Sequence, residues 1–216
     1  MNQKMLFAAG AVAVAALAGC AGGSKPVDYD KLAADIIQSD FQPNGIVTLK
    51  ALQQDANMAA CSAANVSGKP LPEAQAKVLE AAALKTIQWP TDGQFLGDWK
   101  EGEKIAQSGR GMTWTDDAKT VNGGNCYNCH QIDKVEISFG TIGPSLWNYG
   151  KLRGVTNPAS PEAKAIVEYT WGKIWNPQAY NACSMMPRGG HNGVLSPAQI
   201  KHVMALLLDP KSPVNQ

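Results

Sequence analysis

Two cysteines and a histidine form the most specific chemical pattern in the sequence. Cys126, Cys129 and His130 are arranged as C-x-x-C-H, the attachment signature of c-type haem. Two thiols three positions apart lie on one side of a helical turn, so both can form thioethers with the two vinyl groups of one porphyrin. The adjacent imidazole is then placed to ligate the iron. We therefore expect one covalently bound haem c, with His130 as an axial ligand.

Two other chemistries use a similar pair of cysteines. A redox C-x-x-C motif is expected in a βαβ context, and no stretch of this sequence shows sustained strand alternation. A zinc site needs further cysteine or histidine ligands at suitable spacing. The residues that remain for such a site are Cys61, Cys183, His191 and His202.

A second axial ligand is expected 55 or 56 residues after His130, where Met185 and Met186 are adjacent. Ligation by methionine raises the reduction potential relative to a second histidine, which suits an electron acceptor. Met186 directly precedes Pro187, and a backbone fixed by proline can hold a thioether in place. We therefore assign the ligand to Met186, with Met185 and His191 as the alternatives.

The segment Gly143-Pro144-Ser145-Leu146 follows the haem motif by 13 residues. This arrangement resembles class I cytochromes c, in which a proline carbonyl accepts a hydrogen bond from the ligating histidine and fixes its tautomer. The resemblance makes Pro144 the candidate for that contact, and a simple turn is the alternative. Further side chains are candidates for the haem surroundings, at the propionates or, for the aromatic residues, as pocket lining: Trp147, Tyr149, Arg153 and Arg188.

The N-terminus is typical of an export signal. Lys4 is followed by an apolar stretch of about 14 residues, too short to span a bilayer core of ~30 Å. The stretch ends in Leu-Ala-Gly-Cys at Cys20, which resembles a bacterial lipobox, and ordinary signal cleavage nearby is the alternative. We expect residues 1–19 to be removed and Cys20 to be the lipidation site. The expected location is the periplasm, where bacteria attach haem covalently, and a lipidated Cys20 would anchor the chain to the membrane.

Composition and apolar periodicity define the fold class. With 19 basic and 18 acidic residues and 44% hydrophobic residues, the chain is neither a disordered tail, nor a collagen-like repeat, nor a basic nucleic-acid binder. We predict an all-α protein with long loops: a signal peptide at 1–19, an N-terminal helical extension at 20–90 and a class I cytochrome c domain at 91–216. Helices are predicted at 28–40, around the apolar run from Leu49 to Met58, and at 72–88, 98–107, 161–175 and 197–208.

Two of these helices carry specific packing predictions. Gly102 lies inside a helix, where glycine costs about 1 kcal/mol relative to alanine, and it is expected where another helix approaches closely. The last helix begins with Pro197 after Ser196, and its apolar stripe includes Ile200. His202 lies about 200° around that helix from Ile200 and is expected to face solvent.

Five segments of the C-terminal part together resemble one family. They are Asn125–Gln131, Gly140–Leu146, Asn148–Gly154, the Met-Pro-Arg loop with Gly190–Gly193, and the ending Leu206–Asn215. These segments look like the SoxX family, the monohaem cytochrome c subunits of the SoxAX complex of bacterial sulfur oxidation. The resemblance covers residues 95 to 215. Its most specific parts are the Met-Pro-Arg loop followed by Gly-His-Asn-Gly, and the Asp-Pro-x-Ser-Pro-Val ending.

The resemblance implies an activity shared between two subunits, an L-cysteine S-thiosulfotransferase. A SoxA-like c-type cytochrome partner would form the sulfur–sulfur bond between thiosulfate and a cysteine of the SoxY carrier, which releases two electrons. This chain would accept those electrons and pass them to a small soluble cytochrome, without a catalytic residue of its own. The alternative is a freestanding periplasmic class I cytochrome c that works as a monomeric electron carrier.

The chain departs from the family in three ways, and two cysteines remain to be assigned. The lipobox, the long extension after Cys20, and Gly189 in place of an aromatic residue after Met-Pro-Arg are not family features. Gly189 is expected to loosen the distal side of the haem pocket.

In an exported protein, Cys61 and Cys183 are expected to form a disulfide that stabilises the fold by about 4–5 kcal/mol on the chain-entropy model. The alternative is a free, reactive Cys183 thiol that handles sulfur.

Overall fold

The computed structural model describes residues 26–216, so the predicted signal peptide and Cys20 lie outside the described residues. The chain divides into two compact units, Met1–Phe41 and Gln42–Gln216. The described part of the first unit contains α2 (Tyr29–Asp40), which begins where Asp28 accepts a hydrogen bond from the Lys31 amide. No residue of α2 is buried, and Leu32 and Ile36 are 46% and 43% exposed. The predicted helix is confirmed.

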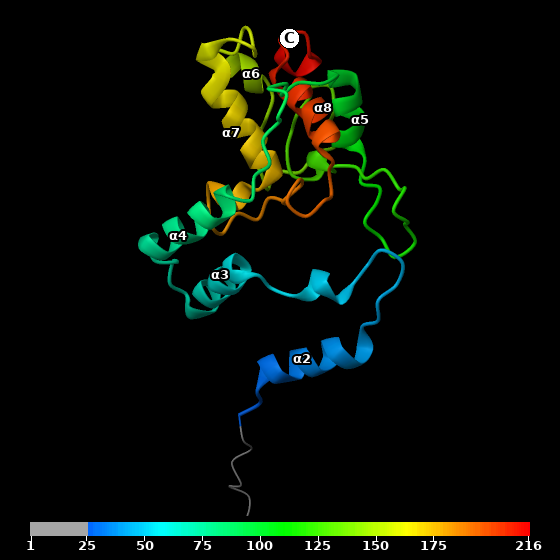
Figure 1. The fold of residues 1–216 in the computed structure, drawn as a ribbon, viewed down its shortest axis with the longest axis vertical. Coiled ribbons are helices and arrows are strands. Elements are labelled where there is room, and N and C mark those ends of the chain that lie inside the picture. Colours follow the sequence, from blue (N-terminus) through cyan, green and yellow to red (C-terminus); the bar gives the residue numbers. More distant parts are fainter. Residues whose placement is uncertain (1–25) are drawn as a thin grey trace, which may run out of the picture. The chain divides into compact units, whose positions relative to one another are not determined.

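The second unit is built from helices, which confirms the prediction of an all-α protein. Within residues 26–216 the extended pairing consists of one isolated bridge, between Asn44 and Val47. The α-helices, shown in Figure 1, are α3 (Ala56–Ser67), α4 (Glu73–Leu84), α5 (Trp99–Gln107), α6 (Tyr149–Leu152), α7 (Lys164–Trp175) and α8 (Pro197–Leu208). Short 3-10 turns lie before α3, between these helices and after α8, at Leu49–Leu52, Cys126–Asn128, Pro161–Ala163, Pro177–Ala179 and Pro213–Asn215.

The core forms where α5 crosses α8, two helices that lie side by side in Figure 1. A Cβ added to Gly102 would lie 2.2 Å from the backbone oxygen of His202, so the close approach predicted at this glycine is confirmed. The solvent-facing position predicted for His202 is wrong. Its Nδ1 accepts a hydrogen bond of 2.9 Å from the Asp98 amide, because the start of α5 covers that side of α8.

The C-terminal residues Ser212–Asn215, here named the clasp, are largely buried and hydrogen-bonded to the same core. Ser212 is fully buried, and its hydroxyl donates to the Leu206 carbonyl at the end of α8. The amide of Asn215 donates to the carbonyls of Leu207 and Asp209, while its Oδ1 accepts from the backbone of Gly150 in α6. The Ser-Pro-Val-Asn ending is therefore a structural element that joins α6 to α8.

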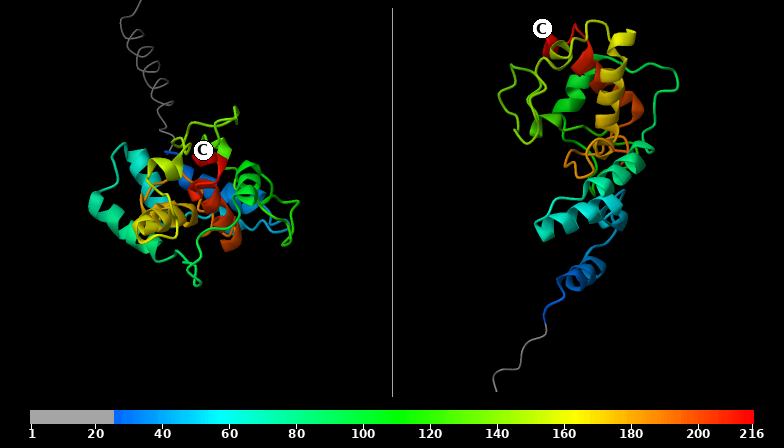
Figure 2. Two further views of the ribbon diagram at one scale, coloured as in Figure 1. Left: turned by 90° about the horizontal axis from the view of Figure 1, so that it is seen from above. Right: turned by 90° about the vertical axis from the view of Figure 1, so that its left-hand side faces the viewer.

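Residues 42–90 belong to the same compact unit as the C-terminal helices, so the division predicted at residue 90 lies instead between Phe41 and Gln42. Two indole groups of α7 make this connection: Trp171 donates to the Gln88 carbonyl and Trp175 to the Thr86 carbonyl, each at 3.0 Å. Figure 2 shows the loop after α7 (orange) against α4. Separating the chain at residue 90 would break these buried contacts.

Candidate functional site

The C-x-x-C-H motif lies on a tight turn that follows α5. Asn125 adopts a left-handed conformation, with φ of 50°, and the 3-10 turn Cys126–Asn128 follows it. The amide of His130 closes the turn by donating to the Cys126 carbonyl at 3.0 Å. Both cysteines of the motif are free thiols, and both are half-buried. The turn thus presents the two thiols and the imidazole from one short segment.

The imidazole of His130 is held by Pro144, as the resemblance to class I cytochromes c implied. Nδ1 lies 2.7 Å from the Pro144 carbonyl oxygen. Because a carbonyl oxygen only accepts, this contact selects the neutral tautomer in which Nδ1 carries the hydrogen and Nε2 keeps a free lone pair. A ligating histidine needs this tautomer, and the hydrogen bond also fixes the orientation of its ring.

Gly143 makes this arrangement possible because the histidine ring lies directly against it. A Cβ at position 143 would lie 2.1 Å from Cε1 of His130 and 2.5 Å from Nδ1. The backbone around it is also fixed, since the Gly143 amide donates to the Cys129 carbonyl at 2.8 Å. Two similar bonds, from Gly140 and Leu146, hold the rest of this loop along the motif. The loop is therefore a built support for His130.

A buried polar contact lies behind the motif. The hydroxyl of Tyr127 donates to Glu103 of α5 at 2.9 Å and accepts from the Asp133 amide at 3.2 Å. Burial raises the pKa of the Glu103 carboxyl, and burial also raises the pKa of the Cys126 thiol to about 12.

The candidate methionines lie in a second loop, between α7 and α8. Met185 is 91% exposed, whereas Met186 is half-buried and its amide donates to the Ser184 hydroxyl at 3.3 Å. Gly189 is buried against the Ile174 carbonyl, from which a Cβ would be 2.9 Å away. The absence of an aromatic residue at this position therefore does not loosen the loop, because close packing against α7 requires glycine there.

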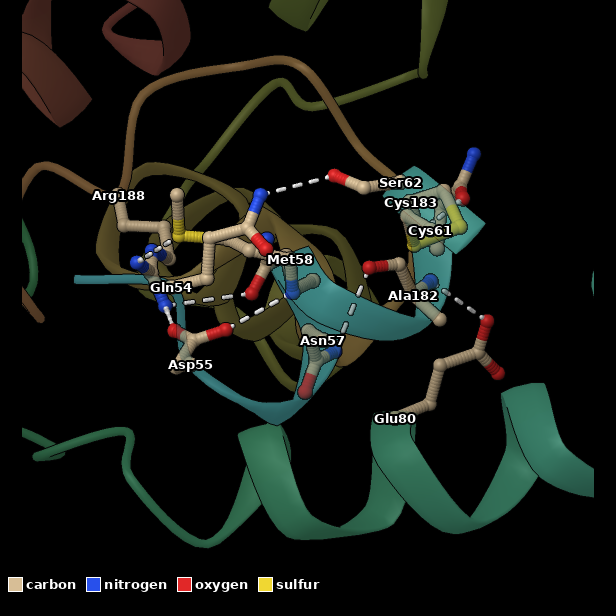
Figure 3. The surroundings of a disulfide bond; sticks show 12 residues. Gln54, Asp55, Asn57, Met58, Cys61, Ser62, Glu80, Ala182, Cys183 and Arg188 are labelled. Atoms are coloured by element: carbon tan, nitrogen blue, oxygen red, sulfur yellow. Dashed lines mark hydrogen bonds and ion pairs between the residues drawn. A yellow bond between two sulfur atoms is a disulfide. The ribbon is translucent and has the colours of Figure 1, made fainter. Parts of the chain in front are cut away.

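Cys61 and Cys183 form a disulfide with a Cα–Cα distance of 5.5 Å, as predicted (Figure 3). The alternative of a free Cys183 thiol is wrong for this structure. The disulfide also removes both cysteines from the set of residues that a zinc site would need. Within residues 26–216, no group of three or more His, Cys, Asp or Glu side chains is arranged to hold a metal ion.

The side chains expected around the haem propionates have partners within the protein. Arg188 forms an ion pair with Asp55 and donates to Gln178 at 3.3 Å, so its guanidinium is already engaged. The Tyr149 hydroxyl is buried against Thr170 at 2.9 Å, with the Arg153 guanidinium 3.7 Å from the centroid of the Tyr149 ring. All three side chains therefore make contacts within the protein.

Two further candidates have different surroundings. Trp147 is half-buried, with the ammonium of Lys134 5.4 Å from its ring centroid. His191 is exposed, and its amide donates to the Trp175 carbonyl. Partial burial and the charge of Arg188 lower the pKa of His191.

The structure therefore brings the predicted residues together in two groups. Cys126, Cys129, His130 and Pro144 form the first, while Met186, the disulfide and Arg188 belong to the second. Sequence reasoning missed Gly143 as the support of the imidazole, although the Gly-Pro pair after the motif was a signal for it. It also missed the residues of α3 and α4 that hold the second group, because their partners lie more than 100 residues away along the chain: Asp55, Asn57 and Glu80.

Comparisons with known proteins add one relative. No protein-family model matches the chain. The chain is 37% identical over 138 residues to a protein of Aquifex aeolicus (strain VF5) described as an uncharacterized lipoprotein. The match covers 61% of this chain and 59% of that protein. None of the helices within residues 26–216 is long and apolar enough to span a membrane.

Proposed function

We propose that Cys126 and Cys129 carry one covalently attached haem c, and that His130 and Met186 would supply the protein ligands of its iron. The observation that supports this most strongly is the 2.7 Å contact between Nδ1 of His130 and the Pro144 carbonyl, which leaves Nε2 as the ligand nitrogen. The two free thiols of the motif fit the thioether attachment. Bound haem would supply one-electron redox chemistry, at a potential raised by methionine relative to a second histidine.

The residues of the chain have separate roles in this proposal. Gly143 and Pro144 orient the His130 imidazole and fix the position of its proton. Tyr127 fills the space behind the motif and is itself buried, which excludes water from that side. The loop with Met186 is held between α7 and the disulfide to α3. On this basis we propose that residues 91–216 adopt a class I cytochrome c fold, with residues 42–90 packed against it in the same compact unit.

The C-terminal motifs support a specific setting for this cytochrome. By resemblance to the SoxX family, the chain is the electron-transfer subunit of a heterodimer with a SoxA-like cytochrome. It accepts electrons when thiosulfate is joined to a carrier-protein cysteine, and it passes them to a small soluble cytochrome. Bond formation belongs to the partner, so the activity as an L-cysteine S-thiosulfotransferase needs both subunits.

We also propose export to the periplasm and a lipid anchor on Cys20. The lipobox-like segment supports this, as does the description of the Aquifex aeolicus relative as a lipoprotein. Expression of wild type and Cys20→Ala in a bacterium, followed by membrane fractionation, tests the anchor. We expect wild type in the membrane fraction with the mass of an acylated Cys20. A Cys20→Ala variant that stays equally membrane-bound would contradict lipid anchoring.

Haem attachment is tested by expressing the full chain with a c-type cytochrome maturation system. We expect the peptide that contains Cys126 and Cys129 to gain the mass of one haem, and the Cys126→Ala/Cys129→Ala double variant to lose it. The matched control is Cys61→Ala/Cys183→Ala, which removes the other two described cysteines and should keep covalent haem. A mature wild type without covalent haem, or haem retained after both motif cysteines are replaced, would overturn the proposal.

A further inference from the structure

Side chains of α3, of its N-terminal cap and of α4 contact both ends of the loop that carries Met186 (Figure 3). At the N-terminal end, the Asn57 amide donates to the Ala182 carbonyl at 3.3 Å, and Glu80 accepts from the Ala182 amide at 3.0 Å. The disulfide from Cys61 fixes Cys183, the next residue. Position 182–183 is therefore held by three side chains of the N-terminal region.

The C-terminal end of the loop is held by Asp55. Its carboxylate forms an ion pair with Arg188, whose side chain is only 15% exposed. The same carboxylate caps α3 by accepting from the Met58 amide at 2.9 Å. Burial alone would raise the pKa of Asp55, but the Met58 and Arg188 contacts hold that pKa below its ordinary value. The start of α3 and the end of the loop therefore share one charged group.

These contacts leave a short segment free between two anchors. Residues 184–187 lie between Cys183 and Arg188, and Met186 is among them. A short chain with both ends fixed has few accessible conformations, so little entropy is lost when one of its side chains is ordered. Breaking either anchor lengthens the free segment and increases the entropy lost on ligation.

We propose that Asp55, Asn57, Cys61 and Glu80, here named the loop clamp, are positioning residues for Met186. The clamp acts through residues 182, 183 and 188 and holds the thioether where it ligates the iron. This inference rests on the proposed haem ligation by Met186, and it gives the N-terminal helical region a role in tuning the haem. Loss of the clamp weakens methionine ligation while covalent attachment at Cys126 and Cys129 continues.

The test uses the haem-loaded full chain and measures how readily added imidazole displaces the methionine from ferric haem, followed by absorbance. Asp55→Asn is the sharpest variant, because asparagine still caps α3 but loses the ion pair with Arg188. We expect it, and the Cys61→Ser/Cys183→Ser double variant, to bind imidazole on the order of tenfold more tightly than wild type. The reduction potentials of both variants should lie below that of wild type, and the variant that binds imidazole more tightly should have the lower potential.

Two controls define the outcome. Glu73→Gln makes the same carboxylate-to-amide change in the exposed ion pair with Lys77 and should bind imidazole like wild type. Circular dichroism of each variant shows that the helices remain folded. If Met186→Ala binds imidazole tightly while the folded clamp variants match wild type, the clamp is refuted and the ligand assignment stands. If Met186→Ala also matches wild type, the ligand assignment fails and the clamp proposal falls with it.

Discussion

Replacement of Gly143 by alanine should displace the imidazole of His130, the proposed haem ligand, while leaving the histidine itself unchanged. The new Cβ would lie 2.1 Å from Cε1 of His130, whereas ordinary contacts begin at 3.4 Å, so the ring must withdraw by about 1.3 Å. The bond from Nδ1 to the Pro144 carbonyl is 2.7 Å long. A movement of this size along that bond takes the two atoms beyond hydrogen-bonding distance.

The expected loss follows from the role of that hydrogen bond. Removing a partner that orients a metal-bound histidine typically costs about 10–100-fold in metal affinity. Protons compete with iron for the imidazole nitrogen, so each tenfold loss raises the acid midpoint of histidine release by about one pH unit. We therefore expect Gly143→Ala to lose His130 ligation about one to two pH units above wild type.

The assay is an acid titration of the ferric, haem-loaded protein, followed by its absorbance in the Soret region. Gly109→Ala is the control, because a Cβ there meets only the side chain of Asn125, at 3.3 Å or more. It should leave the acid midpoint unchanged. A Gly143→Ala protein with the midpoint of wild type would refute the argument that this glycine supports the imidazole.

Three other predictions concern stability. Gly102→Ala places a Cβ 2.2 Å from the backbone oxygen of His202, so we expect the free energy of unfolding, measured in urea, to fall by about 1–3 kcal/mol. A rise in this free energy would contradict the close crossing of α5 and α8. Burial raises the pKa of Glu103, so ionisation of its carboxyl in the folded state is disfavoured and the free energy of unfolding falls as pH rises through that pKa. Glu103→Gln should therefore be more stable relative to wild type at about pH 7 than at about pH 4. A difference in stability that does not change with pH would argue against this. Asn215→Ala removes the side-chain partner of the Gly150 and Lys151 amides and of the Leu207 carbonyl. We expect a loss of about 1–3 kcal/mol for each buried group, and an unchanged melting temperature would exclude this role of Asn215.

Local signals were sufficient for the helices and for the motif. Ser196 and Pro197 predicted the start of α8, and the structure adds the reciprocal bond from Ser196 to Gln199 that completes a capping box. Asp98 similarly precedes α5 as its cap. These signals succeed because a cap acts within one turn of its helix.

Long-range packing accounts for what the sequence did not predict. The position of His202 on its helix gave no sign that Gly97 and Gly102 allow another segment to cover it. The boundary at residue 90 followed a change in composition, but the indole groups of Trp171 and Trp175 bind backbone carbonyls just before it. No local pattern reports such contacts between distant residues.

The candidate site divides in the same way. His130 and Pro144 are 14 residues apart, so a motif and a family resemblance were enough to pair them. Arg188 was a candidate for the haem surroundings, and no local pattern predicted its ion pair with Asp55, 133 residues earlier. The cysteine count predicted the disulfide, but not the hydrogen bonds that accompany it.

The most direct test of the central claim is to isolate the chain from its native periplasm or membrane extract and identify what co-purifies with it. The account predicts a second haem-bearing polypeptide in fixed ratio, and haem reduction that depends on both thiosulfate and a sulfur-carrier protein. A lone monohaem protein that thiosulfate does not reduce, even with the carrier added, would contradict the SoxAX assignment and leave a freestanding electron carrier.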